Sequence, residues 1–127
     1  MKEKEVELFI KICGQLKACY TEISTLAKKK PNDAINKFKL KFINKVLEDA
    51  NKLLKEKYKP FVDFDYFDED EIPTNSDVTM MLLQYLQSME KLRVDNIFCD
   101  KYVWYWKIDD KKSIIKTAHP LKDHKER

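Results

Sequence analysis

The stretch Ser76–Ile97, SDVTMMLLQYLQSMEKLRVDNI, is the long apolar segment of this chain with the fewest lysines. At about 100° per residue, most of its apolar side chains fall within an arc of roughly 140°, as an amphipathic core helix requires. Met80 and Leu83 lie outside that arc, so the first half of the helix should be covered on more than one side. Thr74 or Ser76 can cap its start. The sequence therefore predicts a helix over residues 75–97, buried in the middle of the fold.

Two further amphipathic segments precede this helix. Residues 3–27 carry apolar side chains at alternating spacings of three and four, which predicts a long helix packed at a shallow angle on a neighbour. Residues 34–58 resume the pattern after Pro31, with Asn32 or Asp33 available as the cap. Residues 1–58 are thus predicted to form a long antiparallel helical hairpin. Such long, broad apolar faces favour a homodimer. The two predicted faces are Val6, Phe9, Cys13, Leu16, Tyr20, Ile23 and Ala27, then Ile35, Phe38, Phe42, Val46, Ala50 and Leu53.

Residues 101–118 have the strongest strand pattern. Within Tyr102–Ile108, one face carries Tyr102, Trp104, Trp106 and Ile108. Asp109–Lys112 is a polar turn, and Ser113–Ala118 gives a second short strand. We expect Trp104 and Trp106 to seal the core under this antiparallel β-hairpin. A two-stranded hairpin is marginal by itself, so it either packs on the helices or recruits residues 61–67 as a third strand. We prefer the three-stranded version.

Together these patterns predict a mainly α (α+β) fold in a single domain over residues 1–127, ending in a charged tail over residues 119–127. With 43% apolar residues, the chain can bury a core without disulfides or metals. Three cysteines, without an export signal or a membrane span, indicate reduced thiols and a cytoplasmic protein. Gly14 is the only glycine, which excludes standard phosphate-binding loops, dinucleotide fingerprints and nucleophile elbows.

The net charge of +3 conceals a segregated layout. Residues 1–59 carry 15 lysines and 8 acids, residues 60–77 carry seven acids and no base, and the remainder is again basic. The basic half and the acidic segment either pair within the fold or contact partners of opposite sign.

Residues 59–74, which we call the acidic-aromatic segment, are the most suggestive feature for function. Aspartates alternate with aromatic side chains and are followed by four consecutive acids, a pattern suited to binding a basic protein. The plainer alternative is a strand with its aromatic side chains in the core and its acids in water. The candidate partner-binding residues are Asp63, Asp65, Tyr66, Asp68, Glu69, Asp70 and Glu71, with Tyr105 from the hairpin. The leading hypothesis is a non-enzymatic interaction module of the immunity, antitoxin or adaptor type.

Arg93 is the only arginine before the C-terminal residue, and it falls at the edge of the apolar arc of residues 75–97. It either extends its charged end to solvent or pairs with Asp63, Asp65 or another acid to hold the acidic-aromatic segment.

Two alternatives remain. The basic hairpin is suited to sequence-independent phosphate contacts with nucleic acid, although its lysines are interleaved with acids as on an ordinary solvated helix. A small metal-dependent hydrolase would use the acidic segment, yet the glycine and later glutamate of a calcium loop are missing. We therefore predict no catalytic residue, no metal ligand and no cofactor. The lysines in question are Lys37, Lys39, Lys41, Lys45, Lys52 and Lys55.

Overall fold

The computed structural model describes residues 1–121. It consists of the helices α1 (Glu3–Lys29), α2 (Lys37–Tyr58) and α3 (Asn75–Val94), followed by the strands β1 (Ile97–Asp100), β2 (Val103–Ile108) and β3 (Lys111–Thr117). The predicted mainly α (α+β) class is confirmed. The charged tail predicted over residues 119–127 lies mostly outside the described residues.

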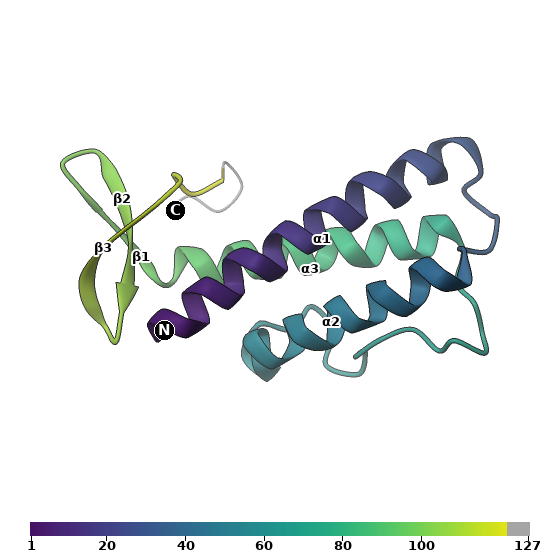
Figure 1. The fold of residues 1–127 in the computed structure, drawn as a ribbon, viewed down its shortest axis with the longest axis horizontal. Helices are drawn as coiled ribbons and strands as arrows, with labels where there is room; N and C mark the ends of the chain where they lie inside the picture. Colours follow the sequence, from purple (N-terminus) through teal and green to yellow (C-terminus); the bar gives the residue numbers. More distant parts are fainter. Residues whose placement is uncertain (122–127) are drawn as a thin grey trace.

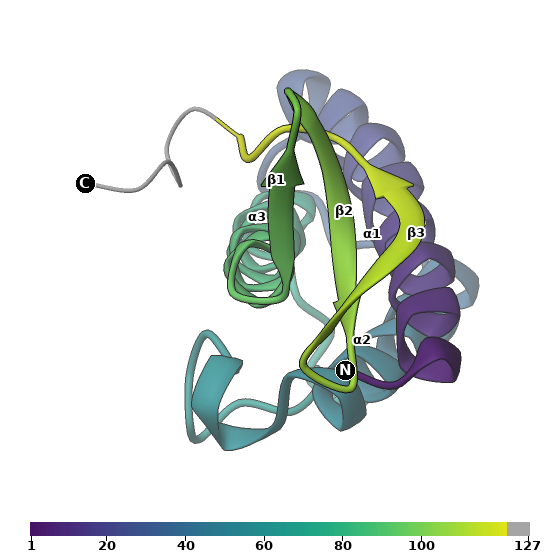
Figure 2. The ribbon, with the colours of Figure 1, turned by 90° about the vertical axis from the view of Figure 1, so that its left-hand side faces the viewer.

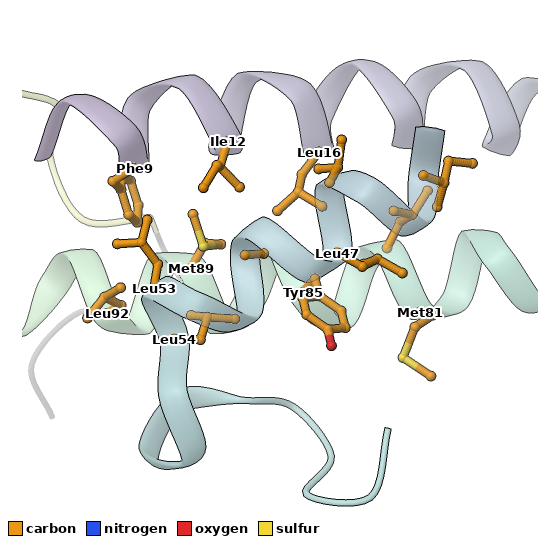
Figure 3. Packing of buried hydrophobic residues seen from close by; sticks show 14 of the residues in the cluster. Phe9, Ile12, Leu16, Leu47, Leu53, Leu54, Met81, Tyr85, Met89 and Leu92 are labelled. Carbon is orange, nitrogen blue, oxygen red and sulfur yellow. The ribbon is translucent and has the colours of Figure 1, made fainter. Parts of the chain in front are cut away.

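Helix α3 packs against both other helices and most extensively against α1. It runs antiparallel to α1 along most of its length, and α2 lies against one side of this pair (Figure 1). Tyr85 and Met89 of α3 are fully buried, as is Leu16 of α1 (Figure 3). α3 begins at a capping box, in which Thr74 Oγ1 accepts a hydrogen bond from Asp77 N at 3.1 Å. It ends at Val94, three residues before the predicted end.

Several apolar side chains predicted to be covered are exposed instead. Phe38 and Phe42 of α2 were predicted on its buried face, but they are 71% and 52% exposed and pack on each other. They were predicted on the buried face because their positions fit the three-and-four spacing of the predicted apolar stripe. In the structure, Leu40, Ile43 and Leu47 occupy the centre of that stripe, and α2 is rotated accordingly. On α3, Met80 and Leu83 also remain exposed, because α1 and α2 cover only part of its circumference.

The three strands form an antiparallel sheet in the order β1–β2–β3 at one end of the helices (Figure 2). The predicted β-hairpin is present as β2 and β3. A third strand was preferred, but assigning it to residues 61–67 was wrong, because β1 takes that place and pairs Ile97 with Trp106. Trp106 is 1% exposed and meets Phe9 of α1 edge to face at 5.1 Å. Trp104 is only half-buried, so Trp106 is the main tryptophan that covers the core under the sheet.

The linker between α1 and α2 is hydrogen-bonded to the residues that begin α3. Ile35 N donates to Pro73 O at 3.0 Å, Asn75 N donates to Asp33 O at 2.9 Å, and Ala34 forms an isolated bridge with Thr74. We call this contact between residues 30–36 and 73–76 the clasp. It brings the start of α2 next to the start of α3.

Helix α2 is capped by Asn36, whose side chain accepts a hydrogen bond from Lys39 N at 3.0 Å. The predicted caps, Asn32 and Asp33, lie upstream in the linker instead. Near its other end α2 is kinked at Lys55, which has a left-handed φ of 55°. The kink separates the last turn of α2 and leads the chain into the acidic-aromatic segment.

Candidate functional site

The acidic-aromatic segment is a loop that two asparagines of α2 hold in place. Asn44 donates from Nδ2 to Phe67 O at 2.8 Å and accepts from Phe67 N at 2.9 Å. Its side chain thus makes the two hydrogen bonds to Phe67 that a neighbouring strand would make. Asn51 Nδ2 donates to Asp65 O at 2.7 Å. Both asparagines lie on α2, seven residues apart and therefore on the same side of the helix. These bonds satisfy loop backbone groups that a sheet would otherwise have satisfied.

Two phenylalanines anchor the loop to the core. The rings of Phe64 and Phe67 are half-buried and meet edge to face at 5.1 Å. Phe64 also approaches Tyr85 of α3, with ring centroids 6.3 Å apart. The hydroxyl of Tyr85 donates to Asn51 Oδ1 at 2.7 Å, which connects α3, α2 and the loop. The backbone of residues 64–67 is thus anchored by side chains of α2 and α3.

The acidic side chains of the loop all face solvent. Asp65 is paired with Lys59, which begins the segment. Among residues 1–121, the other acids of the loop form no ion pair, and only Asp68 has a local bond, accepting from Asp70 N at 2.8 Å. These unpaired acids are Asp63, Asp68, Glu69, Asp70 and Glu71.

Exposed apolar side chains accompany these acids. Val62 is 75% exposed, Tyr66 is 55% exposed and Phe61 is 42% exposed. Tyr66 is therefore exposed on the same loop as the acids. Tyr105 does not join them, because it lies on β2 in the sheet and stacks on Phe98 at 5.6 Å, whereas the loop runs along α2 (Figure 1).

Arg93 does not hold the acidic-aromatic segment, and it does not reach solvent. It is 7% exposed and forms a bidentate pair with Glu90 of the same helix, with both N–O distances at 2.7 Å. Arg93 also donates to Thr117 Oγ1 and to the carbonyls of Ala118 and His119. Glu90 accepts from Leu121 N at 2.9 Å. The pair therefore ties the chain after β3 to α3.

Among residues 1–121, no group of three or more His, Cys, Asp or Glu side chains is placed to hold a metal ion. All three cysteines are free thiols. Burial raises the pKa of Cys13 and of Cys19, which keeps both thiols protonated at neutral pH. None of the helices in this part of the chain has the length and apolar character to cross a membrane.

The supporting residues of the loop were not predicted from the sequence. Asn44 and Asn51 had one available signal, a seven-residue spacing along the edge of an apolar helical face, where polar side chains need buried partners. Glu90 and Arg93 are spaced three apart on a helix, a spacing at which opposite charges meet.

The geometry defines the class of fold, a three-helix α+β protein with a small terminal sheet. No family model, curated protein or solved structure matches the chain.

Proposed function

We propose that this protein is a non-enzymatic interaction module that binds a basic protein through its acidic-aromatic segment. The observation that carries the proposal is a loop held by α2 that exposes unpaired acids beside Val62 and Tyr66. Unpaired acids attract a basic partner and raise the association rate, while exposed aromatic and aliphatic side chains supply contact area.

The way the loop is held strengthens this proposal. A flexible acidic loop would have to lose conformational entropy on binding, which costs affinity. Here Asn44, Asn51, Phe64 and Phe67 already fix the backbone. Asp65 and the acidic run that follows Phe67 are therefore attached to backbone that is already anchored, which lowers the ordering cost of binding.

The nucleic-acid alternative has less in its favour. Of the lysines considered for it, Lys39 approaches Glu22 of α1 and Lys45 approaches Asp49, each at 3.6 Å. Part of the positive charge of α2 is thus neutralised by acids within the fold. A cytoplasmic location and a homodimer stay predictions, and the exposed pair Phe38 and Phe42 supports the second of them.

The test is to neutralise the acidic run and measure retention of protein partners. The tagged wild type and the variant Asp68→Asn/Glu69→Gln/Asp70→Asn/Glu71→Gln are used for affinity purification from the native cell after nuclease treatment. We expect a basic protein to be recovered with the wild type and to be depleted about tenfold or more with the variant, because each lost charge contact contributes up to about 1 kcal/mol.

A matched control changes the same number of charges elsewhere. Glu3, Glu7, Glu48 and Glu56 are exposed acids on α1 and α2, and their replacement by glutamine shifts the net charge equally. The control should retain the partner. Equal retention by both variants would contradict the proposal, and equal loss would show a nonspecific charge effect.

A further inference from the structure

A groove on the molecule lies apart from the acidic-aromatic segment. It is formed by α1, α3 and the chain at the end of β3, and α2 does not line it. Its volume is about 620 Å³, within the range of small-molecule sites. α1 and α3, which supply most of the lining, run antiparallel, and the chain at the end of β3 lies near them (Figures 1 and 2).

The walls of the groove are mainly apolar, and part of that surface is exposed to water. Ile10 of α1 is 55% exposed, Leu83 of α3 is 40% exposed, and Leu121 is 58% exposed. Phe9, Leu86 and Trp106 lie deeper. Apolar side chains gathered around one hollow lose contact with water when an apolar molecule fills it, which favours binding.

The charges in the groove are asymmetric. Glu90 and Arg93 neutralise each other within the lining. Lys17 of α1 and Lys116 of β3 also line the groove, and among residues 1–121 neither has an acidic partner within ion-pair distance. The groove therefore has an apolar interior and a surplus positive charge.

One position in the wall that α1 forms has no side chain. Gly14 lines it from the middle of α1, and a Cβ added there would meet nothing within 4 Å. Glycine in a helix interior is unfavourable by about 1 kcal/mol relative to alanine, and neither a turn nor a close helix contact requires it here. Its effect is to leave the groove wider at this point.

We propose that the groove binds a single-chain amphipathic anion, such as a fatty carboxylate. The hydrocarbon chain would lie against Ile10, Leu83, Leu86 and Trp106, and the carboxylate would be placed near Lys17 and Lys116. The proposal does not depend on the proposed protein interaction, because the two surfaces share no residue.

The few exposed apolar side chains of the groove argue against a helix from another protein as the occupant. Thr117, Ala118 and Leu121 of the lining are held in place by the hydrogen bonds from Arg93 and to Glu90. A docked helix of several turns buries a row of apolar anchors, whereas Ile10, Leu83 and Leu121 are the exposed large apolar side chains here, which suits a single hydrocarbon chain better.

The first test is titration with dodecanoate below its critical micelle concentration, followed by calorimetry and by tryptophan fluorescence, since Trp106 lines the groove. We expect saturable binding of one molecule per chain. Gly14→Phe should weaken binding by about tenfold or more, because the ring occupies the space that the glycine leaves. Gly14→Ala should bind nearly as the wild type does, and circular dichroism should show both variants folded.

The second test concerns charge. Dodecanol has the same chain without the carboxylate and should bind more weakly to the wild type. Lys17→Gln/Lys116→Gln should reduce dodecanoate affinity by about three- to tenfold, as expected for two exposed charge contacts, and should leave dodecanol binding unchanged. Lys11→Gln/Lys91→Gln is the control. It removes one exposed lysine from α1 and one from α3, both outside the groove, and should change the affinity for neither ligand.

Three outcomes would overturn the proposal. The first is absence of saturable dodecanoate binding by the folded wild type. The second is equal binding by wild type and Gly14→Phe, which would place the ligand elsewhere. The third is a dimer in analytical ultracentrifugation that Gly14→Phe dissociates, which would make a second copy of the chain the occupant of the groove.

Discussion

At the scale of single residues, Tyr85 connects the core to the acidic-aromatic segment. It is fully buried, and its hydroxyl donates to Asn51, which in turn holds Asp65. Burial raises the pKa of Tyr85 to about 12 from an ordinary value of 10.0, and the charge of Asp65 acts in the same direction. A raised pKa means that the folded state favours the neutral phenol. The stability from this preference is therefore complete below pH 10 and is lost as the pH rises towards 12.

Tyr85→Phe tests this role. At neutral pH the variant should lose about 0.5–1.5 kcal/mol of unfolding free energy, because Asn51 Oδ1 loses its donor. Between pH 10 and 12 the wild type should lose stability more steeply than the variant, so that the difference between them shrinks. Urea denaturation across this pH range measures both effects. Parallel pH profiles for the two proteins would show that Tyr85 does not contribute.

Arg93, which pairs with Glu90, is the other residue whose replacement should lower the free energy of unfolding strongly. Arg93→Ala leaves Glu90 buried without its partner and frees the carbonyls of Ala118 and His119. We expect a loss of about 3–5 kcal/mol in unfolding free energy. Asp49→Ala removes the exposed pair with Lys45 and should change it by less than about 1 kcal/mol. Similar denaturation midpoints for the two variants would contradict this assignment.

At the scale of elements, the sheet is built with turns that contain no glycine. The β1–β2 turn has Lys101 and Tyr102 at φ 49° and 69°, and the β2–β3 turn has Asp109 and Asp110 at φ 52° and 60°. A type I′ turn requires positive φ at both of its central residues, and the second of them is usually glycine. Each of these side chains therefore adds strain that glycine would avoid.

Asp110→Gly should relieve part of that strain. We expect the unfolding free energy to rise by about 0.5–1 kcal/mol, since glycine adopts positive φ without steric cost. Lys111→Gly, one residue later in the extended backbone of β3, should lower it by a similar amount. Thermal denaturation of both variants gives the sign directly, and a destabilising Asp110→Gly would show that the turn is not strained.

The elements also show how far the sequence alone was informative. The three helices and the β-hairpin were predictable, because each has a strong apolar period. The short strand β1 was not, because Ile97–Asp100 becomes a strand only through pairing with β2. The loop 61–67 has a strand-like alternation, yet Asn44 and Asn51 supply the hydrogen bonds that a neighbouring strand would have provided. In both segments, hydrogen-bond partners that are distant in the sequence determine whether a strand forms.

At the scale of the whole molecule, the candidate surfaces differ in how predictable they were. The acids of the loop are contiguous in sequence, so their exposure as a group could be anticipated. The groove combines Gly14 of α1, Leu83 of α3 and Lys116 of β3. None of these residues has a distinguishing local pattern, and only the packing of α1 against α3 brings them together.

The clasp has a consequence for how the chain reaches this packing. α1 and α3 are far apart in sequence, and contacts of this kind are normally slow to form because a long loop must be closed first. The bonds from Ile35 to Pro73 and from Asn75 to Asp33 close that loop at its base. Once they form, the end of α1 and the start of α3 are held side by side. The entropy of closing a loop of about 40 residues is lost when the clasp forms. α1 can then pair with α3 without a further loop-closure cost, as though the two helices were adjacent in the chain.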